Sequence, residues 1–402
     1  MKRPFLLLLY TAAVLGTFHL TVTTEFPPPP ALEPTLESQQ TNTVPFINCT
    51  DLGIPLKERY PDSQLVSRCP WDLKVFDNKV FVGCGDYDKN TGPTDIMYYD
   101  LEEKTWVNSG TVNDEAITKF LEFDNRLISP GTDPKSSHDF GNYYVFDPFG
   151  WITVSTVPDG VHMYDIEVFG NETFYAIGTP KKENTSPVQK TSDGKTFTSV
   201  PFLKDGKQLF ENRSDTFARC FALFGSGDRL FAFARWYSDG YYGFFEYDGN
   251  AFNLCSENPL FETSGINRQT LLNEHDVLGE KSYFSVGAFY STENFKEFTK
   301  IAVPCDAHVQ DIVTKDGKVY VLTSLKQDSP ESIQAPYKNT VWEYSEENGF
   351  KEILSFNHST TAMSFDVSLG TVYVGLGSTT APTKLNGTIL EFNLITTYTE
   401  IQ

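Results

Sequence analysis

The stretch YDIEVFGNETFYAIG, residues 164–178, consists of two short strand-like segments separated by a Gly-Asn turn. A tight turn of this type between two segments of alternating polarity is typical of a β-hairpin. The same pattern recurs in six further segments, namely 71–85, 117–131, 221–235, 275–289, 310–324 and 365–378. Most of these are followed by two more strand-like segments, as in DIMYYDLEEKTWVNS at 95–109. The chain is therefore built from repeated units.

The spacing of the repeats predicts the fold. Asn78, Asn125 and Asn171 occupy the same turn position and lie 47 and 46 residues apart. Units of four strands at such a period are characteristic of β-propellers. We predict an all-β fold, a seven-bladed β-propeller of four-stranded antiparallel blades over residues 51–402. A strand near 54–69 is expected to close the ring by pairing with the last unit, which removes an exposed sheet edge.

In style the units resemble the Kelch and Asp-box propellers of exported bacterial proteins, at the level of architecture. KTSDGKTFTSV at 190–200 resembles a sialidase-type Asp box that is one residue short. Such boxes are structural turns, and the F/Y-R-I-P stretch of a sialidase site is not present in the sequence. The resemblance implies a fold and leaves the activity open.

The N-terminus predicts export. Two basic residues precede an apolar run in MKRPFLLLLYTAAVLGTFHLTV, so residues 1–23 are a signal peptide or an uncleaved N-terminal anchor. Residues 24–50 are rich in Pro and Thr and are expected to form an extended spacer. We therefore expect a secreted or cell-surface anchored protein, which contacts membrane only if the anchor is retained.

The composition of the chain limits the classes of partner that it can be expected to bind. The 402 residues carry a formal net charge of −21, which repels phosphate backbones and excludes nucleic acid as an expected partner. The acidic surface suits cation binding or simple solubility, and we expect a monomer. The six cysteines form an even number in an exported chain, which makes disulfides plausible. N-glycosylation sequons begin at Asn48, Asn171, Asn184, Asn212, Asn357 and Asn386.

Five of the repeats have an aspartate at the same position, whereas the residue three positions earlier differs from repeat to repeat. Asp72, Asp165, Asp276, Asp311 and Asp366 occupy equivalent places in the inner strands, which predicts that they hold backbone N–H groups. Three residues earlier the pattern breaks, and His162, Arg219 and His308 stand there as unit-specific polar groups. We predict these three at the mouth of the central channel as ligand-binding residues. The alternative is that they merely line a wet channel.

Two loops supply further candidates. DYDKNTGPTD at 86–95 places Asp86, Asp88 and Asn90 at alternating positions, with Asp95 to complete a calcium site, although Gly92 is one place late for an EF-hand. A solvated loop is the alternative, and no cofactor is required. RWYSDGYYGFFEY at 235–247 brings Trp236, Tyr237 and Tyr241 near a predicted mouth loop, where aromatic faces suit a sugar ring or a protein partner. Strand packing is the alternative for these aromatic residues.

These observations favour an extracellular binding module for a glycan or protein ligand, which it contacts through the face that carries the long loops. The alternative is an extracellular polysaccharide hydrolase or lyase with its site at the channel mouth. A carboxylic acid paired with a second carboxylate there would favour the enzyme. Sequence leaves the choice open, because the carboxylates come from different repeats and fold alone does not decide function.

Overall fold

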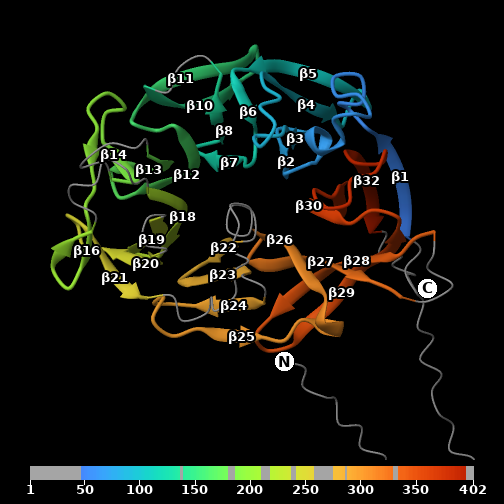
Figure 1. The fold of residues 1–402 in the computed structure, drawn as a ribbon. Helices are drawn as coiled ribbons and strands as arrows, with labels where there is room; N and C mark the ends of the chain where they lie inside the picture. Colours follow the sequence, from blue (N-terminus) through green and yellow to red (C-terminus); the bar gives the residue numbers. More distant parts are fainter. Residues whose placement is uncertain are drawn as a thin grey trace, which may run out of the picture. The chain divides into compact units, whose positions relative to one another are not determined.

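The computed structural model describes residues 47–135, 139–179, 186–209, 218–236, 241–257, 275–285, 288–328 and 334–394. They belong to one compact unit, residues 45–402, whose sheets are arranged in a ring (Figure 1). The inner strands of the ring line a central cavity, which we call the channel. Every regular element in the described part of the chain is a strand, apart from two short 3₁₀ helices, η1 (Leu65–Arg68) and η2 (Pro304–Asp306). The predicted all-β propeller architecture is confirmed.

Within the described residues, five separate four-stranded sheets form blades. The first comprises β2 (Asp72–Phe76), β3 (Lys79–Gly83), β4 (Thr94–Asp100) and β5 (Thr105–Val112). The second comprises β7 (Leu121–Phe123), β8 (Arg126–Pro130), β10 (Phe140–Asp147) and β11 (Gly150–Pro158). The third comprises β22 (His275–Leu278), β23 (Lys281–Ser285), β24 (Phe289–Thr292) and β25 (Thr299–Ile301).

The fourth blade comprises β26 (His308–Lys315), β27 (Lys318–Lys326), β28 (Tyr337–Ser345) and β29 (Gly349–His358). The fifth comprises β30 (Ala362–Ser368), β31 (Thr371–Leu376), β32 (Thr388–Leu394) and β1 (Ile47–Gly53). In this last blade β1 pairs antiparallel with β32, so the N-terminal strand closes the ring. The closing strand thus lies at Ile47–Gly53, before the segment 54–69 that the sequence suggested and partly inside the predicted spacer.

The remaining strands form one 12-stranded sheet. Its members are β6 (Asp114–Ala116), β9 (Thr132–Pro134), β12 (His162–Phe169), β13 (Glu172–Gly178), β14 (Val188–Thr191), β15 (Thr198–Ser199), β16 (Phe202–Lys204), β17 (Lys207–Gln208), β18 (Ala218–Ser226), β19 (Arg229–Trp236), β20 (Tyr241–Tyr247) and β21 (Phe252–Ser256).

The prediction of seven separate four-stranded blades is wrong, because the structure has five such blades and this larger sheet. The physical cause is direct pairing between strand ends of neighbouring repeats. His162 pairs with Thr132, which joins β12 to β9, and Gly178 pairs with Arg219, which joins β13 to β18.

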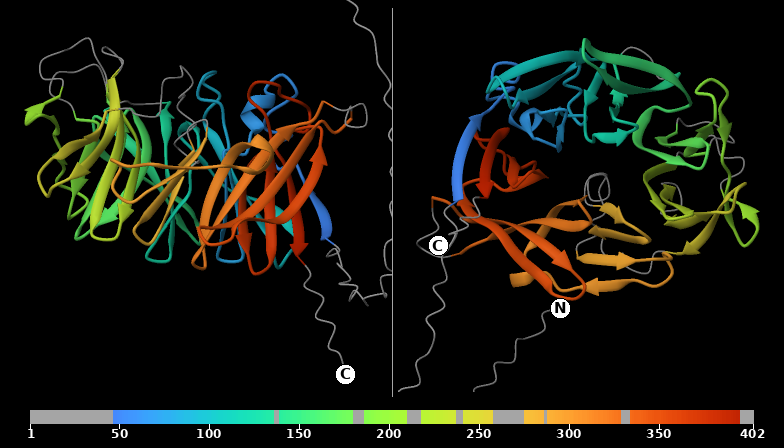
Figure 2. Two further views of the ribbon diagram at one scale, coloured as in Figure 1. Left: turned by 90° about the horizontal axis from the view of Figure 1, so that it is seen from below. Right: turned by 180° about the vertical axis from the view of Figure 1, so that it is seen from behind.

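The hairpins form as the sequence predicted. Turns such as Asp77-Asn78 and Asp124-Asn125 have positive φ at both residues, between 47° and 58°. These are the values of the two-residue turns that match the twist of antiparallel strands, and Asn and Asp adopt them more readily than most residues. In the side view of Figure 2 the strands of the sheets run roughly along the axis of the ring.

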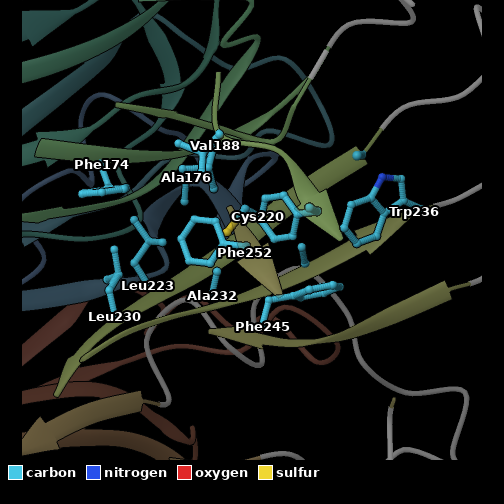
Figure 3. Close-up of a cluster of buried hydrophobic side chains, with 14 residues drawn as sticks. Phe174, Ala176, Val188, Cys220, Leu223, Leu230, Ala232, Trp236, Phe245 and Phe252 are labelled. Carbon is cyan, nitrogen blue, oxygen red and sulfur yellow. The ribbon is translucent and has the colours of Figure 1, made fainter. Parts of the chain in front are cut away.

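The core lies between neighbouring sheets and is largely aromatic and aliphatic. Figure 3 shows its largest cluster, in which Phe174, Cys220, Phe245 and Phe252 pack around strands of the 12-stranded sheet. Trp236 belongs to this cluster and is only 2% exposed. Other clusters join neighbouring blades, as where Leu322 and Val341 pack with Phe365 and Val374, so burial of apolar side chains also holds the sheets together.

Candidate functional site

The repeated aspartates join neighbouring repeats around the channel. Each accepts a hydrogen bond from a backbone N–H of the next repeat along the ring: Asp72 from Phe120 (2.5 Å), Asp165 from Leu223 (2.9 Å), Asp276 from Thr314 (2.6 Å), Asp311 from Phe365 (3.0 Å) and Asp366 from Val75 (2.7 Å). Asp165, Asp276, Asp311 and Asp366 also accept the N–H of the residue that follows them. The prediction that these aspartates are structural is confirmed.

Two junctions between inner strands lack a repeated aspartate, and a group of three charged or polar side chains serves both. Lys119 Nζ lies 2.9 Å from Asp165 Oδ1 and 3.3 Å from His275 Nε2, and His275 Nε2 lies 3.5 Å from Asp165 Oδ2. Lys119 directly precedes Phe120 at the β7 end of its blade, whereas Asp165 is on β12 and His275 on β22. These residues, which we call the cross-channel triad, connect three parts of the ring across the channel.

The triad holds charge in a buried place. The Asp165 side chain is 3% exposed and that of His275 is 4% exposed. Burial opposes ionisation of Asp165, but the Lys119 ammonium and His275 outweigh it and hold the pKa of this carboxyl at about 2. Burial and the neighbouring Lys119 ammonium lower the pKa of His275. At neutral pH the triad is therefore an ion pair of Lys119 and Asp165 beside a neutral imidazole.

His162 and Arg219 come together at the end of the channel where the inner strands begin. His162 starts β12, and its Nδ1 lies 2.5 Å from Asp133 Oδ1, while its Nε2 lies 3.5 Å from an Arg219 terminal nitrogen. The same strand-end pairings that produce the 12-stranded sheet position these side chains. Gly178 is required opposite them, because a Cβ there would lie 2.6 Å from the His162 ring.

A second carboxyl lies beside this group. Glu115 is on β6, whose end pairs with β9, the strand that carries Asp133. Burial and the nearby Asp133 carboxylate raise the pKa of Glu115 to about 7, against the effect of Lys135, whose Nζ lies 3.5 Å from Glu115 Oε1. We call Glu115, Asp133, His162 and Arg219 the mouth cluster. It combines a protonatable acid, a carboxylate, an imidazole and a guanidinium.

The adjacent residue, Asp114, has a structural role beneath the cluster. Its Oδ2 accepts hydrogen bonds from the Tyr144 hydroxyl and from Asn142 Nδ2. Burial raises the pKa of Asp114 to about 6, although both hydrogen bonds act in the opposite direction. Gly131 must be small here, since a Cβ would lie 2.6 Å from the Asp114 carboxylate.

The other predicted ligand residues lie elsewhere. His308 starts β26, in a different blade, and is exposed. Trp236 packs in the core between Phe202 and Phe245, at ring-centroid distances of 5.4 and 5.6 Å. Tyr241 starts β20, and Tyr237 lies outside the described residues. The structure thus brings together His162 and Arg219 among the six candidates.

In the 86–95 loop, local contacts occupy the predicted calcium ligands. Asp86 Oδ1 accepts the backbone N–H groups of Asp88 and Lys89, at 3.1 and 3.3 Å. Asp95 Oδ1 accepts the Thr111 hydroxyl at 2.6 Å, and the Asn90 carbonyl accepts Lys135 Nζ at 3.1 Å. In the described ranges no group of three or more His, Cys, Asp or Glu side chains is arranged to hold a metal ion. Calcium binding stays a prediction.

The six cysteines all lie in described segments and form no disulfide with one another. Cys69, Cys84 and Cys220 are buried, Cys255 is partly buried, and Cys49 and Cys305 are exposed. The disulfides expected from sequence are therefore not seen in the structure. Across the described segments, no helix is long and apolar enough to cross a membrane, and the predicted leader at 1–23 lies outside them.

The sequons fall in different surroundings. Asn48, Asn171 and Asn357 are exposed on or beside strands. Asn386 is fully buried, and its Nδ2 donates to the carbonyls of Leu65 and Ser378. Asn184 and Asn212 are outside the described residues.

The sequence analysis did not select Lys119, Glu115 or Asp133 as site residues, although the position of Lys119 in its repeat was informative. Lys119 stands six residues before Asn125, as Asp72 and Asp165 stand six residues before Asn78 and Asn171. A lysine in an aspartate position implies a neighbouring carboxylate, and Asp165 is that neighbour. Glu115 and Asp133 lie outside the repeated columns, and only the pairing of β6 with β9 places them together.

No protein-family model and no curated protein sequence matches the chain. Solved propeller structures do match over most of its length. A streptogramin B lyase is 11% identical with a TM-score of 0.49, covering 87% of this chain and 98% of its own. Virginiamycin B lyase from Staphylococcus aureus is 10% identical with a TM-score of 0.45, covering 87% and 100%. A chain of a mitotic checkpoint complex is 9% identical with a TM-score of 0.47, covering 91% and 98%.

The likeness is one of fold. Identities near one in ten carry no information about ligands or chemistry, so function has to be argued from the side chains at the site.

Proposed function

We propose that the propeller is an extracellular binding module and that a glycan occupies the mouth cluster. The observation that carries this proposal is the row formed by Asp133, His162 and Arg219, with contacts of 2.5 and 3.5 Å along it. Sugar hydroxyls donate and accept hydrogen bonds, so they are suited to a site where carboxylate acceptors and a guanidinium donor lie side by side.

A glycan is favoured over a protein partner because of where the aromatic residues lie. Protein interfaces are typically centred on buried aromatic or arginine anchors that are exposed in the free protein. Trp236, the best candidate for such an anchor, is 2% exposed and belongs to the core. The mouth cluster is partly buried, with side-chain exposures of 12% for His162 and 20% for Asp133, which suits the end of a slender ligand.

The proposal is tested by screening wild-type protein against a glycan array and measuring hits by calorimetry. Arg219→Met and His162→Gln should each weaken the binding of a hit by about tenfold, the cost of one charged hydrogen bond. His308→Gln is the matched control, because His308 occupies the equivalent strand position in a different blade. Equal affinity in all four proteins would reject the mouth cluster as the site.

One observation supports the alternative of a polysaccharide hydrolase or lyase. Glu115, with its pKa near 7, lies close enough to Asp133 for the two carboxyls to interact, so an acid and a carboxylate share the cluster. If the protein is an enzyme, a bound polysaccharide should be cleaved, and Glu115→Gln should stop cleavage while binding persists. A binding module predicts an intact polysaccharide after prolonged incubation.

A further inference from the structure

The cavity that forms the channel is separate from the mouth cluster. Its volume is about 270 Å³, and its lining comes from the inner strands at and after the repeated aspartates, on the side of the hairpin turns. His162 lies three residues before Asp165, about 10 Å along the strand toward the opposite end. The cross-channel triad lines the cavity, and none of the four mouth-cluster residues does.

One wall of the cavity presents a positive charge without a direct partner. Lys74, on β2, makes no hydrogen bond or ion pair with any residue in the part of the chain that the structure describes. Burial disfavours its charged form, but the carboxylates of Asp366, Asp72 and Asp276 raise the pKa of Lys74 above its ordinary value. Lys74 therefore stays an ammonium group, and its N–H donors have no hydrogen-bond acceptor among the described residues.

A carboxyl on another inner strand presents the opposite charge. Glu167 lies on β12, and in Figure 1 the blade that contains β7 separates β12 from β2 along the ring. The Val168 and Gly225 backbone N–H groups face the Glu167 carboxyl, and the Val168 nitrogen lies 3.2 Å from Oε1. A carboxylate can accept further hydrogen bonds, so Glu167 can also accept from a ligand. Burial, together with the Asp165 carboxylate, raises the pKa of Glu167 to about 7. A cation beside it would favour its ionised form.

Most other charged side chains of the lining are engaged with protein groups. Asp72 accepts the Phe120 N–H, whereas Glu122, on β7, is exposed and adds a carboxylate near Lys74. Asp165, Asp276, Asp311 and Asp366 each accept two backbone N–H groups, and Lys119 is paired within the cross-channel triad. A purely cationic ligand would meet the Lys74 ammonium, and a purely anionic one would meet the surrounding carboxylates. A ligand that carries both charges avoids both repulsions.

We infer that this cavity binds a small zwitterion, an amino acid in the broad sense, with its carboxylate at Lys74 and its ammonium at Glu167. A volume of 270 Å³ is enough for a compact molecule of this class and too small for a folded peptide segment. This site does not depend on the proposed glycan function, since none of the four mouth-cluster residues lines the cavity.

Isothermal titration of the intact protein with 4-aminobutyrate, β-alanine and 6-aminohexanoate tests the inference. Butylamine, butyrate and putrescine provide comparisons that lack one charge or duplicate it. At least one of the three zwitterions should bind at least tenfold more tightly than any of these comparisons. In Asp72→Asn, which removes the second carboxyl that titrates beside Lys74, the affinity of that zwitterion should increase between pH 6 and pH 8, as Glu167 ionises while Lys74 remains charged.

Variants assign the two ends. Lys74→Met and Glu167→Gln should each weaken the zwitterion by about tenfold or more, and Arg219→Met, in the mouth cluster, should leave its affinity unchanged. If Lys74→Met fails to fold, the comparison of zwitterions with singly charged ligands in the wild-type protein still tests the inference. Absence of binding by every zwitterion, or equal binding of putrescine, would overturn the inference. If Arg219→Met loses glycan binding but still binds the zwitterion with wild-type affinity, the two sites are independent and the inference about the cavity is supported.

Discussion

At the scale of single residues, Asp165 connects more of the molecule than any other repeated aspartate. It accepts the Leu223 N–H from β18, pairs with Lys119 and contacts His275 on β22. Asp72, Asp276 and Asp311 each serve one junction, and Asp366 serves one and also lies 3.6 Å from Lys315 Nζ on β26. Asp165 serves its own junction and contributes to the two junctions at which the aspartate is replaced.

Asp165→Ala should therefore lower the free energy of unfolding by about 3 kcal/mol, because it leaves the Lys119 ammonium buried without its partner and the Leu223 N–H without its acceptor. Urea denaturation followed by circular dichroism measures the loss. Asp328→Ala removes an exposed carboxylate and is the control, expected within about 0.5 kcal/mol of wild type. Similar stability of the two variants would contradict the structural role of Asp165.

The roles of residues were predictable from sequence where they repeat. Five aspartates in one column indicated a common structural task, and the hydrogen bonds confirm it. The proximity of His162 to Asp133 was not predictable, because it depends on the pairing of β12 with β9. Trp236 looked like a ligand contact in a loop-rich stretch, yet the burial of β19 against its neighbours places it in the core.

At the scale of elements, the hairpins were predictable, whereas the strand that closes the ring was expected near 54–69 and lies at Ile47–Gly53. Asn, Asp and Gly at the turns specify their geometry locally. The closing strand β1 precedes all the repeats and pairs with β32, more than 330 residues later, through contacts such as Asp51 with Leu390. Trp106 Nε1 also donates to the Leu52 carbonyl, which ties β1 to the next blade. Such long-range pairing leaves no local pattern in the sequence.

Removal of β1 should weaken the ring. Deletion of residues 1–53 exposes the edge of β32 and should lower the melting temperature by about 5 °C or more, on a scale of roughly 2 °C per kcal/mol for a chain of this size. Deletion of residues 1–46 retains β1 and is the matched control. Light scattering should show association in the longer deletion alone, because an open strand edge pairs with other chains. Equal melting of the two truncated proteins would show that β1 does not stabilise the ring.

At the scale of the whole molecule, the number of separate blades was the part of the fold that sequence reasoning got wrong. Counting repeats gave seven, but the structure has five separate four-stranded blades because strand ends around His162 and Arg219 pair across repeats. Repeat counting assumes that each unit pairs within itself. The departure coincides with the mouth cluster, so the pairing that joins the sheets also positions the candidate site.

The ring of channel carboxyls predicts how stability depends on pH. Burial raises the pKa of Asp72 to about 7, although the Phe120 N–H and Lys74 act against it. An unfolded aspartate titrates near 4, so between about pH 4 and pH 7 the folded state holds a proton that the unfolded state has lost. The contribution of Asp72 to stability therefore decreases as pH rises through this window. Asp165 has the opposite shift, and its contribution is constant above about pH 5 and decreases only in acid.

Asp72→Asn and Asp165→Asn separate these effects, since each substitution removes the charge and keeps an oxygen acceptor. From pH 5 to pH 8 the stability of Asp72→Asn relative to wild type should rise, by on the order of 1 kcal/mol, because the wild-type protein must ionise a buried carboxyl and the variant need not. Asp165→Asn should be less stable than wild type at every pH in the same range, since Asp165 is ionised throughout it. Urea denaturation at pH 5, 6, 7 and 8 measures both differences. A flat difference for Asp72→Asn would mean that the wild-type Asp72 carboxylate is ionised throughout this range, stabilised by Lys74 on the same strand.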